Sequence, residues 1–301
     1  MFDPGEHRSE CEKYLGHHLG CQVELVRAER LKKGTRTAPW QLVVNTDRGQ
    51  KSYLLQLDPR NLEFEYQMLE VMAAVPVPTP RAYGLDLEGD ALGVPCFFSD
   101  FVAGETLLGP MQAGEAWAEE LYINAVCQLQ AVTEEDLGSM AQRLERVTAE
   151  DVLDDAYGAL KRRSLPLADA AYRALKARMP DFPPVLFSNG DLWLENFLVK
   201  GERLAGVIDF PNATFSDPVY EFLLSFFVSP GLQGRGIEER YCRRLGVDPA
   251  ILHWYHGLEY LDTWRWVLET GESFVHHTAE SLEANLQQWL ASQATRRMSW
   301  L

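Results

Sequence analysis

Short apolar runs alternate with polar turns along the first hundred residues, a pattern that is typical of strands. After an opening helix, residues 23–29, 40–46 and 52–57 have strand character. Hydrophobic positions then recur at helical spacing over residues 61–74, which predicts a helix. The proline-rich run 75–80 must end this helix, because proline cannot continue one.

Two more strands follow the predicted helix. Residues 81–87 and 94–101 flank a Glu88-Gly89-Asp90 turn, which indicates a hairpin. The pattern over residues 1–102 therefore predicts a five-stranded sheet with a helix. We expect it to form a small lobe of its own.

The character of the sequence changes after Gly104. Residues 111–180 and 234–301 show helical periodicity, and a compact strand–loop–strand region at 185–220 lies between them. We therefore expect a larger, mainly helical lobe over residues 103–301.

The charge balance and the cysteine content limit the partners and the cellular location that we expect. The chain has 44 acidic against 28 basic residues, and a surface this acidic repels phosphate backbones, so we expect no nucleic-acid partner. No apolar run approaches the ~20 residues that span a bilayer, so we expect no membrane partner. Five widely spaced cysteines without a CxxC pair, and an N-terminus that lacks an apolar signal segment, favour a cytoplasmic location. The sequence leaves open a monomer or a weak homodimer.

The candidate chemistry lies within residues 186–221. Asp191 is followed by Asn196 and then by Asp209. Asn196 opens an apolar strand and Asp209 closes the next one, so a hairpin with its turn at Lys200-Gly201-Glu202 would place them side by side. Carboxylate and amide oxygens there suit Mg²⁺ beside substrate phosphates. Asp191, one loop earlier, could deprotonate a hydroxyl, as transfer of a γ-phosphoryl group requires.

Three segments carry a family resemblance: Asn189-Gly190-Asp191 with Asn196, Val207-Ile208-Asp209-Phe210, and Ser216-Asp217-Pro218-Val219-Tyr220-Glu221. Together they resemble the catalytic core of the aminoglycoside phosphotransferase and choline kinase-like family, small-molecule kinases that share the protein-kinase fold. The resemblance implies an α+β, protein-kinase-like two-lobe fold, with a small antiparallel-sheet N-lobe and a larger, mainly helical C-lobe. It also implies that Asp191 is the catalytic base, that Asn196 and Asp209 bind Mg²⁺, and that Asp217 is a buried carboxylate bracing the catalytic loop.

The same resemblance implies a site for ATP or GTP. Glu65 takes the helix position that pairs with a strand lysine, with Glu63 and Glu70 as rivals. The residues expected to bind the nucleotide are Gln56, Glu65, the hinge residues Ser99, Phe101 and Val102, and Gly34 in the loop that covers the phosphates.

Two positions depart from the family pattern. Asn189 stands in place of a histidine, and Gln56 stands where the family has a lysine or arginine that grips the α- and β-phosphates. Charge-assisted hydrogen bonds are about twice as strong as neutral ones, so Gln56 predicts weaker nucleotide binding. This leaves two functions open: a kinase that phosphorylates a hydroxyl of a small molecule, such as a cationic aminoglycoside or amino alcohol, or a catalytically impaired pseudokinase that binds a nucleotide or metabolite.

Acceptor-binding residues are the least constrained by the sequence. Trp193 lies between Asp191 and Asn196, and Glu259, Asp262 and Trp266 follow in an aromatic-rich helical segment. Carboxylates beside tryptophans suit an ammonium group. The alternative is that the aromatic residues of this segment belong to the core.

Overall fold

The computed structural model describes residues 2–31, 39–57, 60–229 and 231–298. Contacts divide the chain into two compact units. The sheet unit comprises Met1–Gly109, Val132–Arg143 and Glu195–Ala213, and the helical unit comprises Pro110–Ala131, Leu144–Leu194 and Thr214–Leu301. Two later segments thus belong to the sheet unit, and the simple division after residue 102 stays a prediction.

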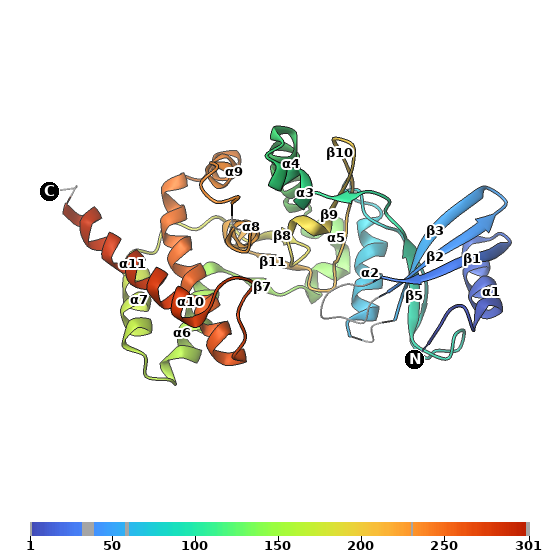
Figure 1. Cartoon of the computed structure of the whole chain (residues 1–301), viewed down its shortest axis with the longest axis horizontal. Helices are drawn as coiled ribbons and strands as arrows, with labels where there is room; N and C mark the ends of the chain where they lie inside the picture. The colour runs from blue at the N-terminus through green and yellow to red at the C-terminus, as the bar shows by residue number, and fades with distance from the viewer. Residues whose placement is uncertain (1, 32–38, 58–59, 230, 299–301) are drawn as a thin grey trace. The chain divides into compact units, whose positions relative to one another are not determined.

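The sheet unit contains the expected five strands and helix (Figure 1). In chain order its first elements are α1 (Arg8–Leu19), β1 (Val23–Arg30), β2 (Trp40–Thr46), β3 (Gly49–Gln56), α2 (Leu62–Met72), β4 (Ala82–Asp86) and β5 (Cys96–Asp100). The strands pair in the order β1-β2-β3-β5-β4, and every pairing is antiparallel. The predicted β4–β5 hairpin is therefore confirmed.

Alternation along the strands builds the core of this sheet. Leu25, Leu42, Leu55 and Phe98 are all buried, and α1 covers them with residues that include Leu15. Since successive side chains of a strand point to opposite faces, the alternating pattern gives β2 and β3 one buried face, whereas β5 is buried on both faces.

A second, three-stranded sheet completes the unit. It runs in the order β10-β9-β6 and consists of β6 (Glu105–Thr106), β9 (Phe197–Lys200) and β10 (Arg203–Val207). The unit also includes α5 (Glu134–Leu137) and η1 (Gly138–Arg143).

The helical unit is built around one long helix, α10 (Leu252–Thr270). Its other helices are α4 (Ala116–Gln130), α6 (Ala149–Lys161), α7 (Pro166–Lys176), α8 (Pro218–Phe227), α9 (Ile237–Leu245), η3 (Pro249–Ile251) and α11 (Ala279–Met298), and α3 (Leu108–Ala113) leads into it. A small sheet in the order β7-β11-β8 joins β7 (Arg146–Val147), β11 (Thr214–Ser216) and β8 (Leu186–Ser188). Tyr255, Leu258 and Leu261 of α10 are buried in the core shared with α6, α7, α8 and α11.

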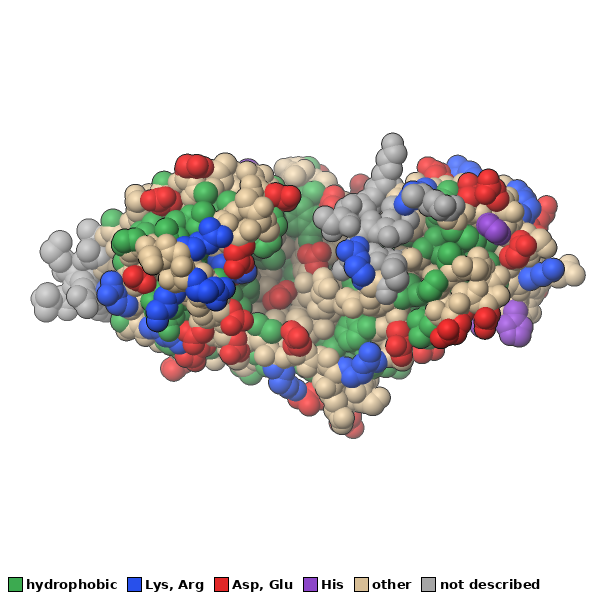
Figure 2. Space-filling model, turned by 90° about the horizontal axis from the view of Figure 1, so that it is seen from below, with side chains coloured by type: hydrophobic (Ala, Val, Ile, Leu, Met, Phe, Trp, Pro, Cys, Tyr) green, Lys and Arg blue, Asp and Glu red, His purple; other side chains and the backbone are tan. Residues whose placement is uncertain are grey.

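The acidic surplus is spread over the surface. On the face that Figure 2 shows, Asp and Glu side chains are scattered over each unit with Lys and Arg between them. Among the described residues, no helix combines the length and the apolar character needed to cross a membrane.

Candidate active site

The hairpin that was expected to carry a metal site is present. β9 and β10 pair antiparallel with Phe197 opposite Val207, and their turn falls at Gly201 and Glu202. At the open end, the Ile208 backbone N–H donates to the Asn196 carbonyl oxygen over 2.9 Å. Asn196 is therefore held beside the residue that precedes Asp209, which confirms the predicted juxtaposition.

The Asp209 backbone adopts a conformation that few residue types accept. Its φ is 67°, in the left-handed region, two residues after the end of β10. Aspartate, asparagine and glycine tolerate this region better than other residues. The conformation therefore favours the residue types whose side chains can present an oxygen there.

The donor set at the hairpin end fits Mg²⁺. Asp209 supplies a carboxylate and Asn196, only 2% exposed, supplies an amide oxygen, and both are hard oxygen ligands. Magnesium in phosphate-transferring sites takes one or two protein carboxylates and completes its shell with substrate phosphates and waters. In the described part of the chain, no group of three or more His, Cys, Asp or Glu side chains could hold a metal ion. The metal-binding roles of Asn196 and Asp209 stay predictions.

In the helical unit, Asp191 lies in a loop that begins at the end of β8. Asn189, which is fully buried, donates through Nδ2 to the Asp191 carbonyl oxygen over 3.0 Å. The Asp191 backbone N–H approaches Asn189 Oδ1 at 3.4 Å, and the Trp193 backbone N–H donates to Asp191 Oδ1 over 3.3 Å. Asn189 thus uses both its donor and its acceptor to fix the backbone of Asp191.

Two buried hydroxyl groups also hold this loop, through the residue after Asp191. Tyr122 of α4 donates to the Leu192 carbonyl oxygen over 2.6 Å, and Ser225 of α8 donates to the same oxygen over 2.7 Å. A buried oxygen with two donors is well satisfied. These two residues are 70 and 33 positions from Leu192, and no local motif in the sequence pointed to them.

Glu221 of α8 reaches the start of the loop through a serine. Ser188 Oγ accepts from the Gly190 backbone N–H over 3.0 Å and donates to Glu221 Oε2 over 3.3 Å. Burial is the main cause that raises the pKa of Glu221 to about 7; the nearby carboxylates of Asp191 and Asp217 act in the same direction, and hydrogen bonds from Ser188 and Ser216 act against them. The start of the loop is therefore held, through Ser188, by a carboxyl group whose pKa is near neutral.

The side-chain hydrogen bonds of Asp217 lie in α8 and α10, and its expected role in bracing the catalytic loop stays a prediction. Its carboxylate is buried, as predicted, but it caps α8 by accepting from the Val219 and Tyr220 backbone N–H groups, both over 3.0 Å. It also accepts from the Tyr255 hydroxyl over 2.7 Å. The Asp217 carboxylate thus joins α8 to α10, whereas the Glu221 carboxylate accepts from Ser188 at the start of the catalytic loop.

The residues expected to bind nucleotide are distributed over β3, α2 and β5. Gln56 ends β3 opposite Phe97, and Ser99 is buried in β5 opposite Leu54. Glu65 lies in the first turn of α2 and is partly buried. Their contacts with a nucleotide stay predictions.

The hinge residues Phe101 and Val102 follow directly after β5. The Phe101 backbone N–H donates to the Ser52 carbonyl oxygen over 3.2 Å. The side chain of Val102 fits against Gly206, where an added Cβ would come within 3.0 Å of it. Gly34 lies outside the described residues.

The four candidate acceptor-binding residues differ in how deeply they are buried. Glu259 is fully buried in α10, and neither of its carboxyl oxygens has a hydrogen-bond partner among the described residues. Glu259 has no exposed surface in this structure, and its role in binding an acceptor stays a prediction. Sequence spacing placed it on one helix face with Asp262, but it could not show that this part of the face is covered.

The other three candidates likewise stay predictions. Asp262 accepts from the Tyr220 hydroxyl over 2.7 Å and pairs with Arg265 at 2.7 Å, so its charge is already compensated. Trp193 and Trp266 are partly buried against the core of the helical unit. Trp266 also packs edge-to-face on Phe274.

Replacing Glu259 with methionine is expected to stabilise the protein at pH 8 by about 1–3 kcal/mol, because it removes a buried polar group that lacks a partner. Burial holds the pKa of Glu259 well above its usual range, so the folded state keeps a proton that the unfolded state releases near pH 4.3. The contribution of this carboxyl to stability therefore falls as pH rises above that value. Urea unfolding at pH 5 and pH 8 should show a smaller gain at pH 5.

The matched control is Glu283→Met, which changes an exposed glutamate of α11. It should leave the pH dependence unchanged. A Glu259→Met variant that is less stable than the wild type at pH 8 would contradict the assignment of an unpartnered carboxyl.

Comparison with known proteins agrees with this geometry. The sequence profile of the phosphotransferase enzyme family matches residues 30–258. A curated mouse protein, acyl-CoA dehydrogenase family member 10, is 22% identical over 287 residues; the match covers 85% of this chain and 26% of the mouse protein. The chain thus spans about a quarter of the length of that relative.

Solved structures share the fold at low sequence identity. A Ralstonia eutropha protein assigned as an aminoglycoside phosphotransferase superposes with a TM-score of 0.68 at 16% identity, covering 97% of this chain and 99% of its own. A mutant of aminoglycoside phosphotransferase APH(4)-Ia, solved with ADP and hygromycin B, gives 0.62 at 16% identity, with 93% and 98% covered. APH(2″)-IIIa, solved with GDP and kanamycin, gives 0.61 at 15% identity, with 96% and 99% covered.

These superpositions confirm the predicted kinase-like fold, with its antiparallel sheet and its many helices. The profile match extends over well more than half of the chain and includes Asp191, Asn196 and Asp209. The chain therefore belongs to the phosphotransferase enzyme family.

Proposed function

We propose that this protein transfers the γ-phosphoryl group of ATP or GTP to a hydroxyl of a small molecule, such as an aminoglycoside or an amino alcohol. The observation that carries the proposal is the braced loop that presents Asp191, followed in the chain by a hairpin with Asn196 and Asp209 at one end. The relatives solved with ADP and hygromycin B, or with GDP and kanamycin, support a nucleotide as donor and a hydroxyl-bearing small molecule as acceptor.

In the proposed reaction, the Asp191 carboxylate accepts the proton of the acceptor hydroxyl. The acceptor oxygen bonds to the γ-phosphorus while the bond from that phosphorus to the bridging oxygen breaks, and the nucleoside diphosphate leaves with that oxygen. Asn196 and Asp209 would hold Mg²⁺, which when bound neutralises phosphate charge. The supports from Asn189, Tyr122 and Ser225 keep the Asp191 backbone in one position, and such positioning is much of what a phosphoryl-transfer enzyme supplies.

The second candidate function is a pseudokinase that binds nucleotide without turning it over, and Gln56 is the observation that favours it. Gln56 is partly buried near the end of β3, whereas Lys51 of the same strand is exposed and five residues away. Residues an odd number apart on a strand point to opposite faces, so Lys51 cannot replace the missing cation.

The two functions are separated by measuring melting temperature and slow nucleotide hydrolysis with Mg·ATP and Mg·GTP. For a kinase, the nucleotide raises the melting temperature of the wild type, since a ligand that binds the folded state stabilises it. We expect Gln56→Lys to bind nucleotide about tenfold more tightly, because it replaces a neutral hydrogen bond with a charge-assisted one. The matched control is Gln50→Lys, the same change at an exposed position of β3.

A wild type that hydrolyses nucleotide and phosphorylates one member of a panel of aminoglycosides and amino alcohols supports the kinase. A wild type that binds nucleotide but neither hydrolyses it nor phosphorylates any member of the panel supports the pseudokinase. We also propose a cytoplasmic location, for which the five free cysteines give support.

A further inference from the structure

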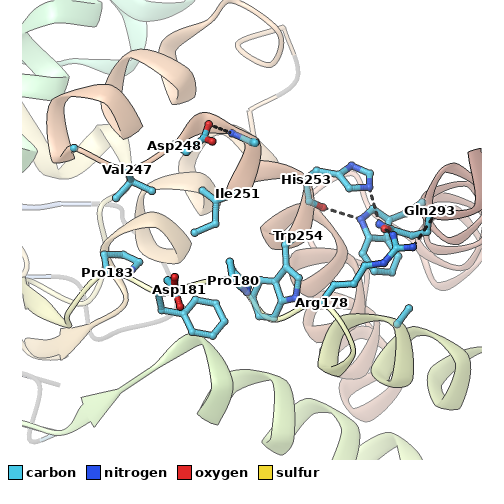
Figure 3. Close-up of a pocket in the computed structure, with 15 residues that line it drawn as sticks. Arg178, Pro180, Asp181, Pro183, Val247, Asp248, Ile251, His253, Trp254 and Gln293 are labelled. Carbon is cyan, nitrogen blue, oxygen red and sulfur yellow. Dashed lines mark hydrogen bonds between the residues drawn. The ribbon is translucent and has the colours of Figure 1, made fainter. Parts of the chain in front are cut away.

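The helical unit contains a cavity that no part of the proposed reaction uses. It has a volume of about 830 Å³ and lies between the end of α7, the segment after α7, the turn before α10, and α11 (Figure 3). Small-molecule sites typically measure about 300–1,000 Å³. None of the loop residues 188–193 lines it, so it is separate from the candidate active site.

One wall of the cavity is rigid and apolar. Trp254 and Ile251 are each less than a tenth exposed, and Trp254 donates through Nε1 to the Leu175 carbonyl oxygen over 3.0 Å. Phe182 packs edge-to-face on Trp254, with 4.9 Å between ring centroids. Val247 and Pro183 extend this wall. A ligand that fits here needs an apolar body.

Arg178 supplies a positive charge to the same cavity. Its guanidinium donates to the side-chain and backbone oxygens of Gln293, and no carboxylate among the described side chains forms an ion pair with it. This is unexpected in a chain with 44 acidic against 28 basic residues. A guanidinium has five N–H donors, so it can bind an anion and keep both bonds to Gln293.

A chain of hydrogen bonds holds Arg178 in place without neutralising it. Because Arg178 can only donate, the Gln293 atom that it contacts is the oxygen, and Gln293 Nε2 must then donate to His253 Nε2, 2.6 Å away. His253 consequently carries its proton on Nδ1. Gln293 is 9% exposed, and Trp289 fixes the His253 backbone by donating to its carbonyl oxygen over 2.7 Å. The guanidinium is therefore oriented before any ligand arrives, as a binding group should be.

Two carboxylates limit the charge that the cavity can accept. Asp181 and Asp248 line it on the other side of Trp254 from Arg178, as Figure 3 shows, and both are exposed. Asp248 also accepts from the Ala250 backbone N–H over 2.9 Å. A ligand with one negative charge satisfies Arg178, whereas a second negative charge would meet these carboxylates.

We propose that this cavity binds a small organic monocarboxylate with an aromatic or branched apolar body, its carboxylate on Arg178 and its body against Trp254, Ile251 and Phe182. The site combines one cation, one apolar wall and two carboxylates that disfavour a second negative charge on the ligand. It does not depend on the proposed phosphotransfer, because it shares no residue with that reaction.

The test is titration calorimetry of the whole protein with 3-phenylpropanoate. Two comparison ligands keep the apolar body and change the charge: 3-phenylpropylamine is cationic, and phenylsuccinate adds a second carboxylate. We expect 3-phenylpropanoate to bind one per chain, the amine not to bind, and phenylsuccinate to bind at least tenfold more weakly than 3-phenylpropanoate.

Two variants address the site from different sides. Arg178→Met should weaken binding of 3-phenylpropanoate at least tenfold, while Arg173→Met, at an exposed position of α7, should not. Ala250→Trp places a large side chain at the lining and should abolish binding while leaving Arg178 in place. Melting temperatures show that each variant is folded.

The proposal is overturned if 3-phenylpropanoate does not bind at millimolar concentration or if the amine binds as tightly as the acid. It is also overturned if folded Arg178→Met and Ala250→Trp both bind like the wild type. Phenylsuccinate binding as tightly as 3-phenylpropanoate would remove the limit to one charge and so contradict the ligand class.

Discussion

Replacing Asp191 with asparagine is expected to lower the rate of phosphoryl transfer by a factor of about 10²–10⁴, the usual contribution of a general base. The reason is that the carboxylate accepts the proton of the acceptor hydroxyl and an amide cannot. Asparagine has nearly the same shape, and its oxygen can still accept from the Trp193 backbone N–H, as Asp191 Oδ1 does over 3.3 Å. The loop should therefore keep its conformation while the chemistry is lost.

The measurement is the rate of nucleotide hydrolysis, and of transfer once an acceptor has been found, alongside the melting temperature with and without Mg·nucleotide. The matched control is Asp155→Asn, which changes an exposed aspartate of α6 in the same unit and should alter neither quantity. An Asp191→Asn variant with more than a tenth of the wild-type rate would show that Asp191 is not the base. An equal nucleotide-induced shift in both proteins would show that the loss lies in the chemical step.

Much of the fold could be predicted because its signals are local. The strands of the sheet unit appear as short alternating runs, and the prolines after residue 74 end α2 in the way that proline geometry demands. The approach of Asn196 to Ile208, the residue before Asp209, was predictable for the same reason. A short hairpin brings the residues at its two ends together whatever the rest of the chain does.

The supports of the site could not be predicted because they come from distant parts of the chain. Tyr122 and Ser225 meet at one carbonyl oxygen only after α4 and α8 have packed. The helix α10 is rich in aromatic and aliphatic residues on several faces, so the sequence could not show that Glu259 is buried while Asp262 is partly exposed. The cavity around Arg178 likewise requires α7, α10 and α11 to converge.

Replacing Asp209 with asparagine is expected to remove most of the stabilisation that Mg·nucleotide gives the wild type. A ligand at 100 times its Kd stabilises a folded protein by about 2.7 kcal/mol, which raises the melting temperature of a protein of this size class by several degrees. Asparagine removes one negative charge that would hold Mg²⁺ together with the phosphates. The complex of the protein with Mg·nucleotide should therefore weaken strongly.

Asparagine is the informative replacement because of the backbone. At a φ of 67°, asparagine is tolerated about as well as aspartate, whereas alanine would add strain that lowers stability for an unrelated reason. The melting temperature should therefore be unchanged without ligand and differ only with Mg·ATP or Mg·GTP, and nucleotide without Mg²⁺ should affect both proteins equally. Asp191→Asn is the second reference, since it should keep the Mg·nucleotide shift. If Asp209→Asn also keeps it, Asp209 does not hold the metal, and the hairpin end has another role.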